Sequence, residues 1–99
     1  MQLMIGEIVS CEEVPNSRKL LCSQVSFGKN NVKQIVSGIK RTYSAEDMVG
    51  KKVVAIVNLK PCKLAGVVSE GMLLCAEDPE GNLSLLTTEK DFPGGCFIS

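Results

Sequence analysis

The hydrophobic residues of this chain lie in short runs that turn-forming residues separate. The first three runs alternate in part with polar residues and span Leu3–Ser10, Lys19–Phe27 and Val32–Ser37. Alternation at this length is typical of strands with one buried face. Pro15-Asn16-Ser17 and Gly28-Lys29-Asn30-Asn31 are turn signals between them. The N-terminal part of the chain is therefore predicted to form three strands, the last two joined as a hairpin.

The pattern continues in the second half of the chain. Further strands are predicted at Lys52–Val57, Met72–Glu77 and Leu83–Thr87, with a turn at Asp78-Pro79-Glu80-Gly81-Asn82 between the last two. Between the fourth and fifth strands lies Asn58–Gly71, which we predict to be a long loop, because it carries a proline, two glycines and two lysines between two apolar runs.

One short helix is predicted between the third and fourth strands. Ser44 has the side chain of an N-cap, Glu46 and Asp47 fall in the first turn, and Gly50 ends the segment. Five or six short strands with a helix at this place are the order of an OB-fold, an all-β, five-stranded Greek-key barrel. A lipocalin-like or SH3-like barrel is the alternative, and the capped helix favours the OB-fold over both.

Size and composition fit a single domain covering residues 1–99. The chain is 44% hydrophobic and 22% charged, and a domain of this length buries roughly 60–65% of its unfolded surface. The five cysteines are widely spaced without a Cys-x-x-Cys pair, and the chain has no histidine. We therefore expect neither a metal site nor a catalytic thiol, and no cofactor. The absence of a leader-like start and of a long apolar run predicts a cytoplasmic protein that does not enter a membrane.

Charge is polarised along the chain although the formal net charge is zero. Residues 18–63 hold ten basic and two acidic residues, a net charge of +8, and the flanking segments hold the balancing acids. Such a chain can present a basic face to an anion while it stays neutral overall. Lysines scattered over the surface are the other interpretation, because clustering in sequence need not survive folding.

The segment Asn58–Met72 carries the chemistry best suited to a ligand. It contains two lysines, a side-chain amide, a hydroxyl, and two glycines that let backbone amides approach a ligand. In an OB-fold, ligands lie on strands two and three, between the loop joining strands one and two and the loop joining strands four and five. The first of these loops holds Arg18 and Lys19, and the second holds Lys60 and Lys63, so these four cations are expected to converge.

Several motifs resemble those of a known family. They are Gln34-Ile35-Val36-Ser37-Gly38-Ile39, Tyr43-Ser44-x-Glu46-Asp47-x-Val49-Gly50-Lys51, Asn58-Leu59-Lys60-Pro61-x-Lys63-Leu64-x-Gly66-Val67-x-Ser69-Glu70-Gly71-Met72 and Asn82-Leu83-x-Leu85-Leu86-Thr87. Together they are similar to the tRNA-binding domain appended to many methionyl-tRNA synthetases. That domain also forms the N-terminal part of the endothelial-monocyte-activating-polypeptide module and occurs as a free-standing bacterial tRNA-binding protein.

The resemblance implies an OB-fold that binds tRNA by its structure rather than its sequence, has no catalytic residues, and delivers tRNA to an aminoacyl-tRNA synthetase in cis or in trans. Residues at matching positions are the candidate RNA-binding residues, with two more cations included for their charge and loop position. The full set is Asn58, Lys60, Lys63, Ser69, Met72, Ser37, Gly38, Arg18 and Lys19.

The chain departs from the family pattern at a few positions. Met4 stands where an arginine is common, and Cys62 and Ala65 stand where charged residues are frequent. The chain starts close to its first strand, whereas family members usually carry extra residues there. The second subdomain that imitates a dimer partner in some members does not follow the barrel, so a homodimer is the expected assembly.

Other functions fit the sequence less well. A dimeric, export-related chaperone of the same fold superfamily, which would bind unfolded peptides in an apolar groove, is the main alternative. A generic single-strand binder would need aromatic side chains for stacking, and the chain has one tyrosine, three phenylalanines and no tryptophan. No nucleophile, phosphate-cradling loop or metal-ligand spacing indicates an enzyme.

Overall fold

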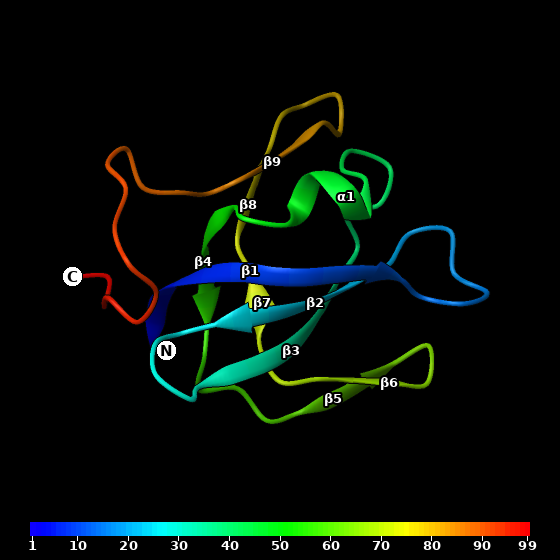
Figure 1. The fold of residues 1–99 in the computed structure, drawn as a ribbon. Coiled ribbons are helices and arrows are strands. Elements are labelled where there is room, and N and C mark those ends of the chain that lie inside the picture. Colours follow the sequence, from blue (N-terminus) through cyan, green and yellow to red (C-terminus); the bar gives the residue numbers. More distant parts are fainter.

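The computed structural model describes every residue from Met1 to Ser99. Its main feature is an antiparallel five-stranded sheet in the order β3-β2-β1-β4-β7. Figure 1 shows this sheet curling on itself, with the helix above it and a small hairpin below. The strands of the sheet are β1 (Leu3–Glu13), β2 (Leu21–Ser26), β3 (Val32–Ser37), β4 (Lys52–Ile56) and β7 (Met72–Leu73).

Two further hairpins complete the set of strands. One pairs β5 (Cys62–Leu64) with β6 (Val67–Ser69), and the other pairs β8 (Cys75–Glu77) with β9 (Leu83–Leu85). The second hairpin is joined to the sheet, because Leu74 N–H donates to the carbonyl of Val54 (2.9 Å) and Val54 N–H donates to the carbonyl of Leu86 (3.2 Å). The chain therefore continues the sheet past β7.

The free edge of β3 is covered by the end of β6 and the residue that follows it. Glu70 N–H donates to the carbonyl of Gln34 (2.7 Å), and Gln34 N–H donates back to Oε1 of Glu70 (2.9 Å). Val36 N–H, further along β3, donates to the hydroxyl of Ser69 (2.9 Å). These bonds satisfy an edge that would otherwise be open to pairing with another chain, and they nearly close the barrel.

The barrel interior is filled by aliphatic side chains from alternate positions of the strands. Leu21 and Val25 of β2 are fully buried, together with Ile8, Ile35 and Val53 from the neighbouring strands. Full burial of such a side chain stabilises the fold by about 1.5–3 kcal/mol. The small aliphatic core explains how the chain closes a barrel with few aromatic residues.

The helix lies where the sequence predicts it, between β3 and β4. In α1 (Ala45–Met48), the hydroxyl of Ser44 caps the N-terminus by accepting from Asp47 N–H (3.2 Å), and Gly50 follows with φ +90°. Met48 is fully buried and joins the core from this helix. The predicted OB-fold arrangement is confirmed. No helix of the structure has the length and apolar character needed to cross a membrane.

The bounds of every predicted strand except β3 differ from those in the structure. β1 runs to Glu13, three residues further than predicted, and its register against β2 shifts between Ile8 and Ser10. Such a bulge lets a strand bend around a small barrel, and period-two alternation cannot reveal where it falls. The predicted strand Met72–Glu77 is divided at Leu74 into β7 and β8, and the predicted strand Leu83–Thr87 ends at Leu85.

The prediction that Asn58–Gly71 is wholly a loop is wrong. Residues 62–69 form the β5–β6 hairpin, whose turn has two successive residues with positive φ, Ala65 (+49°) and Gly66 (+82°). Because most of these residues are exposed, the hairpin has no buried face that would produce an alternating pattern in the sequence.

Candidate nucleic-acid interface

Two projecting segments lie on the same side of the barrel. The loop between β1 and β2 and the β5–β6 hairpin both extend to the right in Figure 1, with β2 and β3 between them. The first carries Arg18 and Lys19, and the second carries Lys63, with Lys60 just before it. The sequence placed its candidate cations on these two segments, and the fold brings both segments to one side.

The lysines in and just before the hairpin are free to meet a ligand. Lys60 and Lys63 are both exposed, and neither forms an ion pair with a carboxylate. Lys63 lies on β5 opposite Val68 of β6, so its position is fixed by the hairpin backbone. An exposed lysine in a paired strand suits contact with a phosphate, since the charge is already solvated and needs no partner in the free protein.

The side-chain amide of Asn58 uses its oxygen, but not its nitrogen, in a hydrogen bond within the protein. Its Oδ1 accepts from Gln2 N–H (2.7 Å), which ties the end of β4 to the start of the chain. The Nδ2 group is not used in a hydrogen bond within the protein, so it can donate to an RNA oxygen without the loss of a protein contact.

Ser69 is enclosed by the protein. The residue is 4% exposed, its hydroxyl accepts from Val36 N–H (2.9 Å), and it donates to the carbonyl of Gly71 (3.0 Å). These contacts give Ser69 a part in shaping the segment after the hairpin. Glu70, which sequence reasoning did not select, has the same kind of part because its carboxylate binds the backbone of Gln34 (2.9 Å).

An apolar groove of about 330 Å³ lies between β3, the hairpin and β7–β9. Met72 is 52% exposed at this groove, so it is available to a ligand and is not a core residue. The hydroxyl of Ser37 is buried there without a hydrogen-bond partner. The groove is lined by Val36, Ser37, Gly38, Ile39, Leu64, Met72, Leu73, Cys75 and Leu83.

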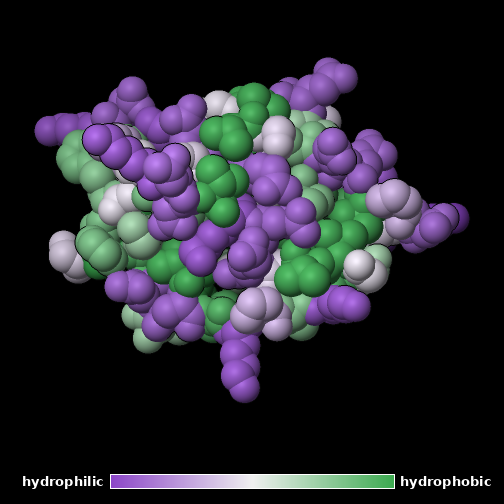
Figure 2. All heavy atoms as spheres, turned by 60° about the horizontal axis from the view of Figure 1, so that its bottom comes forward, coloured by the Kyte–Doolittle hydropathy of each residue, from purple (hydrophilic) through white to green (hydrophobic).

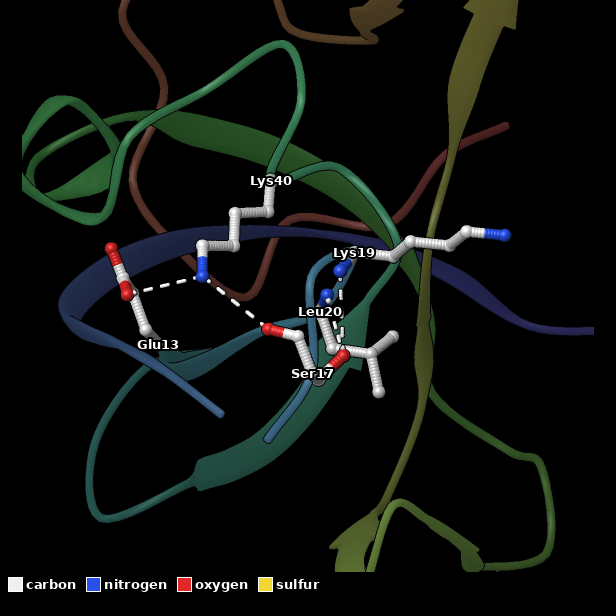
Figure 3. Close-up of polar contacts among 5 residues, drawn as sticks. All are labelled: Glu13, Ser17, Lys19, Leu20 and Lys40. Atoms are coloured by element: carbon white, nitrogen blue, oxygen red, sulfur yellow. Dashed lines mark hydrogen bonds and ion pairs between the residues drawn. The ribbon is translucent and has the colours of Figure 1, made fainter. Parts of the chain in front are cut away.

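The β1–β2 loop holds its two cations in different directions. The hydroxyl of Ser17 accepts from the N–H groups of Lys19 (3.4 Å) and Leu20 (3.2 Å), which fixes the backbone at the end of the loop. Figure 3 shows the Lys19 side chain extending away from Lys40 and Glu13. Arg18 instead lines a depression that Lys40 also lines. Sequence reasoning did not select Lys40, since it follows β3 and is distant from this loop in the chain.

Other cations of residues 18–63 are engaged elsewhere. Lys52 pairs with Asp91 (2.6 Å), and its hydrogen bond to that carboxylate raises the pKa of the ammonium group. Lys51 lies 5.7 Å from the centre of the Tyr43 ring. Lys29 is in the β2–β3 turn, at the other end of the barrel from the β1–β2 loop (Figure 1). The basic stretch therefore divides on folding, and only part of it lies beside the hairpin.

The surface on the hairpin side is mixed in character. Figure 2 turns the bottom of Figure 1 forward and shows hydrophilic residues across the middle of this face, flanked by hydrophobic patches.

The five cysteines are all unpaired thiols. Burial raises the pKa of Cys11, Cys22 and Cys75, which keeps these thiols protonated.

Comparison with known proteins decides the family. Residues 3–96 match the model of a family described as "Putative tRNA binding domain". The chain belongs to this tRNA-binding domain family. Over 98 residues it is 57% identical to methionine–tRNA ligase of Methanocaldococcus jannaschii, covering 99% of this chain and 15% of the ligase.

Two solved structures are similar to this chain in both fold and sequence. The MetRS related protein of Pyrococcus horikoshii is 36% identical, with a TM-score of 0.92 and coverage of 99% of this chain and 89% of that one. The chaperone CsaA of Bacillus anthracis is 33% identical, with a TM-score of 0.88 and coverage of 99% and 90%. The chain is thus similar both to a protein described as a methionine–tRNA ligase and to one described as a chaperone.

Proposed function

We propose that residues 1–99 act as a single domain that binds tRNA, catalyses no reaction, and delivers tRNA to an aminoacyl-tRNA synthetase, above all a methionyl-tRNA synthetase. Membership of the tRNA-binding domain family carries this proposal. The two projecting segments on one side of the barrel, each with exposed cations, support it.

In this proposal the candidate residues divide into three roles. Lys60, Lys63, Arg18 and Lys19 neutralise RNA phosphates, and Asn58 donates its Nδ2–H to the sugar–phosphate backbone or to a base edge. Ser69 holds the segment in place. Ser37, Gly38 and Met72 border the groove, where an unstacked base can lie against apolar side chains.

Recognition of this kind depends on the shape of the RNA. The candidate RNA-binding residues include no aromatic side chain for stacking, and their cations contact phosphates, which carry no sequence information. With about four to six phosphate contacts, the logarithm of the association constant should fall with the logarithm of salt concentration with a slope near −3 to −5.

The proposed partner follows from the length of the relatives. The chain spans 14–15% of the methionine–tRNA ligases that it matches, and in this proposal it corresponds to their tRNA-binding part and not to their catalytic part. A binding domain joined to a synthetase, covalently or by association, raises the effective concentration of tRNA at the catalytic site. We propose that this delivery of tRNA takes place in the cytoplasm.

We also propose a homodimer. Phe97 is 64% exposed and Ile98 is 41% exposed, and the C-terminal segment lies against the start of β1, where Ile98 N–H donates to the carbonyl of Leu3 (3.1 Å). Phe92 is exposed in the same segment. A second copy that covered these side chains would bury apolar surface now in water.

Titration of fluorescently labelled tRNA with this chain tests the proposal. Binding at low ionic strength should weaken with salt as given above, and unlabelled tRNA should compete better than oligo-dT. Lys60→Ala with Lys63→Ala should weaken binding and make the salt slope shallower by about two. Lys90→Ala, an exposed lysine outside both segments, is the control and should change neither. Undetectable or salt-independent binding would refute the proposal.

A second candidate function is chaperone activity toward unfolded peptides. The apolar groove favours it, because seven of its nine lining residues are hydrophobic, and a relative of 33% identity is described as a chaperone. An extended peptide with apolar side chains would fill such a groove.

The two functions separate in one pair of assays. Met72→Gln and Leu64→Gln should reduce the suppression of aggregation of a heat-denatured test protein if the groove binds peptides, and should have smaller effects on tRNA binding than the lysine substitutions. Suppression of aggregation by the wild type, with no measurable binding of tRNA, would favour the chaperone function.

A further inference from the structure

Lys40 and Arg18 share a depression beside the β1–β2 loop. Its volume is about 460 Å³, and Glu13 is its one acidic lining residue. Lys40 is not among the candidate RNA-binding residues, although the fold brings it to the same loop as Arg18. Two cations on one concave surface suit an anion, and the carboxylate of Glu13 opposes that use.

Lys40 is held in this position by its backbone and its side chain. Its N–H donates to the carbonyl of Lys19 (3.1 Å). Its Nζ lies 3.1 Å from Oε1 of Glu13 and donates to the carbonyl of Ser17 (3.3 Å). Figure 3 shows the three groups converging, with Glu13 and Ser17 on either side of the ammonium group.

The loop that surrounds Lys40 is ordered by its own contacts. Val14 is 3% exposed. The N–H of Val14 donates to the carbonyl of Leu20 (3.4 Å), and Ser17 N–H donates to the carbonyl of Val14 (3.1 Å). The Ser17 hydroxyl accepts from two further N–H groups. These bonds fix the backbone of the loop, and with it the positions of Arg18 and of the Ser17 carbonyl.

The bond between Glu13 and Lys40 can be exchanged. The Glu13 side chain is 64% exposed and the Lys40 side chain is 28% exposed, and ion pairs at such sites contribute little to stability because water screens them. A phosphate that reached both Lys40 and Arg18 would gain two charge-assisted contacts in place of one.

We infer that Glu13 is an internal competitor of RNA: its carboxylate neutralises Lys40 in the free protein, and a phosphate of the bound tRNA replaces it, bridging Lys40 and Arg18. This inference rests on the proposed function and adds Lys40 to the interface. The consequence is that removing the negative charge of Glu13 should strengthen tRNA binding, and should do so through Lys40.

The test is a double-mutant cycle on tRNA affinity, measured by titration at fixed salt. Glu13→Gln should raise the affinity up to about fivefold, the largest factor that an exposed ion pair of this kind supplies. Lys40→Met, which keeps the apolar stem, should lower the affinity and make the salt slope shallower by about one. Glu13→Gln should then have no effect in the Lys40→Met background.

Glu12→Gln is the matched control. Glu12 is also exposed and adjacent in β1, but successive side chains of a strand point to opposite faces, so it is directed away from Lys40. The Glu12→Gln substitution removes one negative charge, as Glu13→Gln does. An equal gain in affinity from Glu12→Gln would assign the effect to net charge and overturn the inference.

The remaining outcomes are also decisive. If the wild type binds tRNA and Glu13→Gln leaves the affinity unchanged or lowers it, Glu13 is a spectator or orients Lys40, and the inference is wrong while the proposed function stands. If Glu13→Gln raises affinity equally in the wild-type and Lys40→Met backgrounds, the competition does not act through Lys40. A wild type that binds no tRNA overturns both.

Discussion

At the scale of single residues, Ser69 and Gly6 show how little room the barrel leaves. Ser69 uses its hydroxyl as donor and acceptor at once, in bonds that hold the segment after the hairpin against β3. Gly6 lies on β1 facing the core, where an added Cβ would come within 2.5 Å of Cγ1 of Val25 and 2.7 Å of Cε1 of Phe27. Each position is fixed by packing or bonding that involves residues distant in sequence.

Ser69→Ala should destabilise the fold by about 1–3 kcal/mol, because it leaves the buried N–H of Val36 without an acceptor. Urea denaturation measures the change, and Ser84→Ala on the exposed side of β9 should alter stability by less than about 0.5 kcal/mol. Unchanged stability of Ser69→Ala with lost tRNA binding would instead give this hydroxyl a direct contact with RNA.

Gly6→Ala should cost about 1–3 kcal/mol or more, since Val25 and Phe27 are buried and have no free space to move into. Gly38→Ala is the matched comparison: nothing lies within 4 Å of its added Cβ. Thermal denaturation should show a lower midpoint for the first variant and a nearly unchanged one for the second. Equal midpoints would mean that β1 can shift away from β2 at low cost.

At the scale of elements, the β5–β6 hairpin and the β8–β9 turn depend on a few local groups. The hairpin reverses through Ala65 and Gly66, both at positive φ. The β8–β9 turn is organised by the Asp78 carboxylate, which accepts from the N–H groups of Glu80 (2.9 Å) and Asn82 (2.8 Å) and from Nδ2 of Asn82 (2.9 Å).

Ala65→Asn should stabilise the hairpin, because a left-handed backbone costs alanine about 1 kcal/mol and asparagine followed by glycine favours a two-residue turn. Slower amide hydrogen exchange across β5 and β6 is the expected result. Ala65→Val, with a β-branched side chain at positive φ, should speed the same exchange. Exchange that responded to neither change would show that other contacts of the hairpin decide its opening.

The turn at Asp78 predicts a pH dependence. Hydrogen bonds to the ionised carboxylate, chiefly from the Asn82 side chain, lower the pKa of Asp78 below its ordinary 3.8. The resulting stability is present above the ordinary value and is lost as pH falls through the lowered pKa in the folded state. Unfolding free energy measured from pH 5 to pH 2 should therefore fall less steeply in Asp78→Asn than in the wild type. Glu89→Gln, without such bonds at its side chain, is the comparison.

Strands with a buried face were predictable from sequence, and the exposed hairpin was not. Leu21, Ser23 and Val25 are buried at alternate positions, so period-two alternation marks β2. β3 buries two successive residues, Ile35 and Val36, and the turn signals on either side of it are what gave its bounds correctly. Cys62, Lys63 and Leu64 are all exposed. The hairpin is held by backbone pairing and by its turn, neither of which produces a hydrophobic pattern.

At the scale of the whole molecule, the fold distributes charges that the sequence keeps together. The sequence places the loop cations on one side of an OB-fold, and the structure confirms the fold and the position of both segments. The sequence alone could not reveal that Glu13 pairs with Lys40 or that Asp91 pairs with Lys52. The partners of each pair are distant in the sequence and meet only in the folded chain. Whether the candidate residues bind RNA stays a prediction.

The exposed apolar residues near the C-terminus predict the state of assembly. Phe97→Ser with Ile98→Ser should convert the proposed homodimer to a monomer, because both side chains are exposed in the single copy and removing them lowers the apolar area that a partner could bury. Light scattering coupled to gel filtration at tens of micromolar measures the mass. Val9→Ser, an exposed apolar residue on β1 away from that segment, is the control. A wild type of monomer mass would contradict the proposal.

The closure of β3 by Ser69 and Glu70 sets a practical limit on redesign. A protein engineer who wished to retarget this barrel could exchange the tip of the hairpin, residues 62–67, for a library of other sequences. Ser69 and Glu70, which follow, would have to be retained. Variants that lost them would expose the edge of β3 and aggregate, so the library would be depleted before any new specificity could be selected.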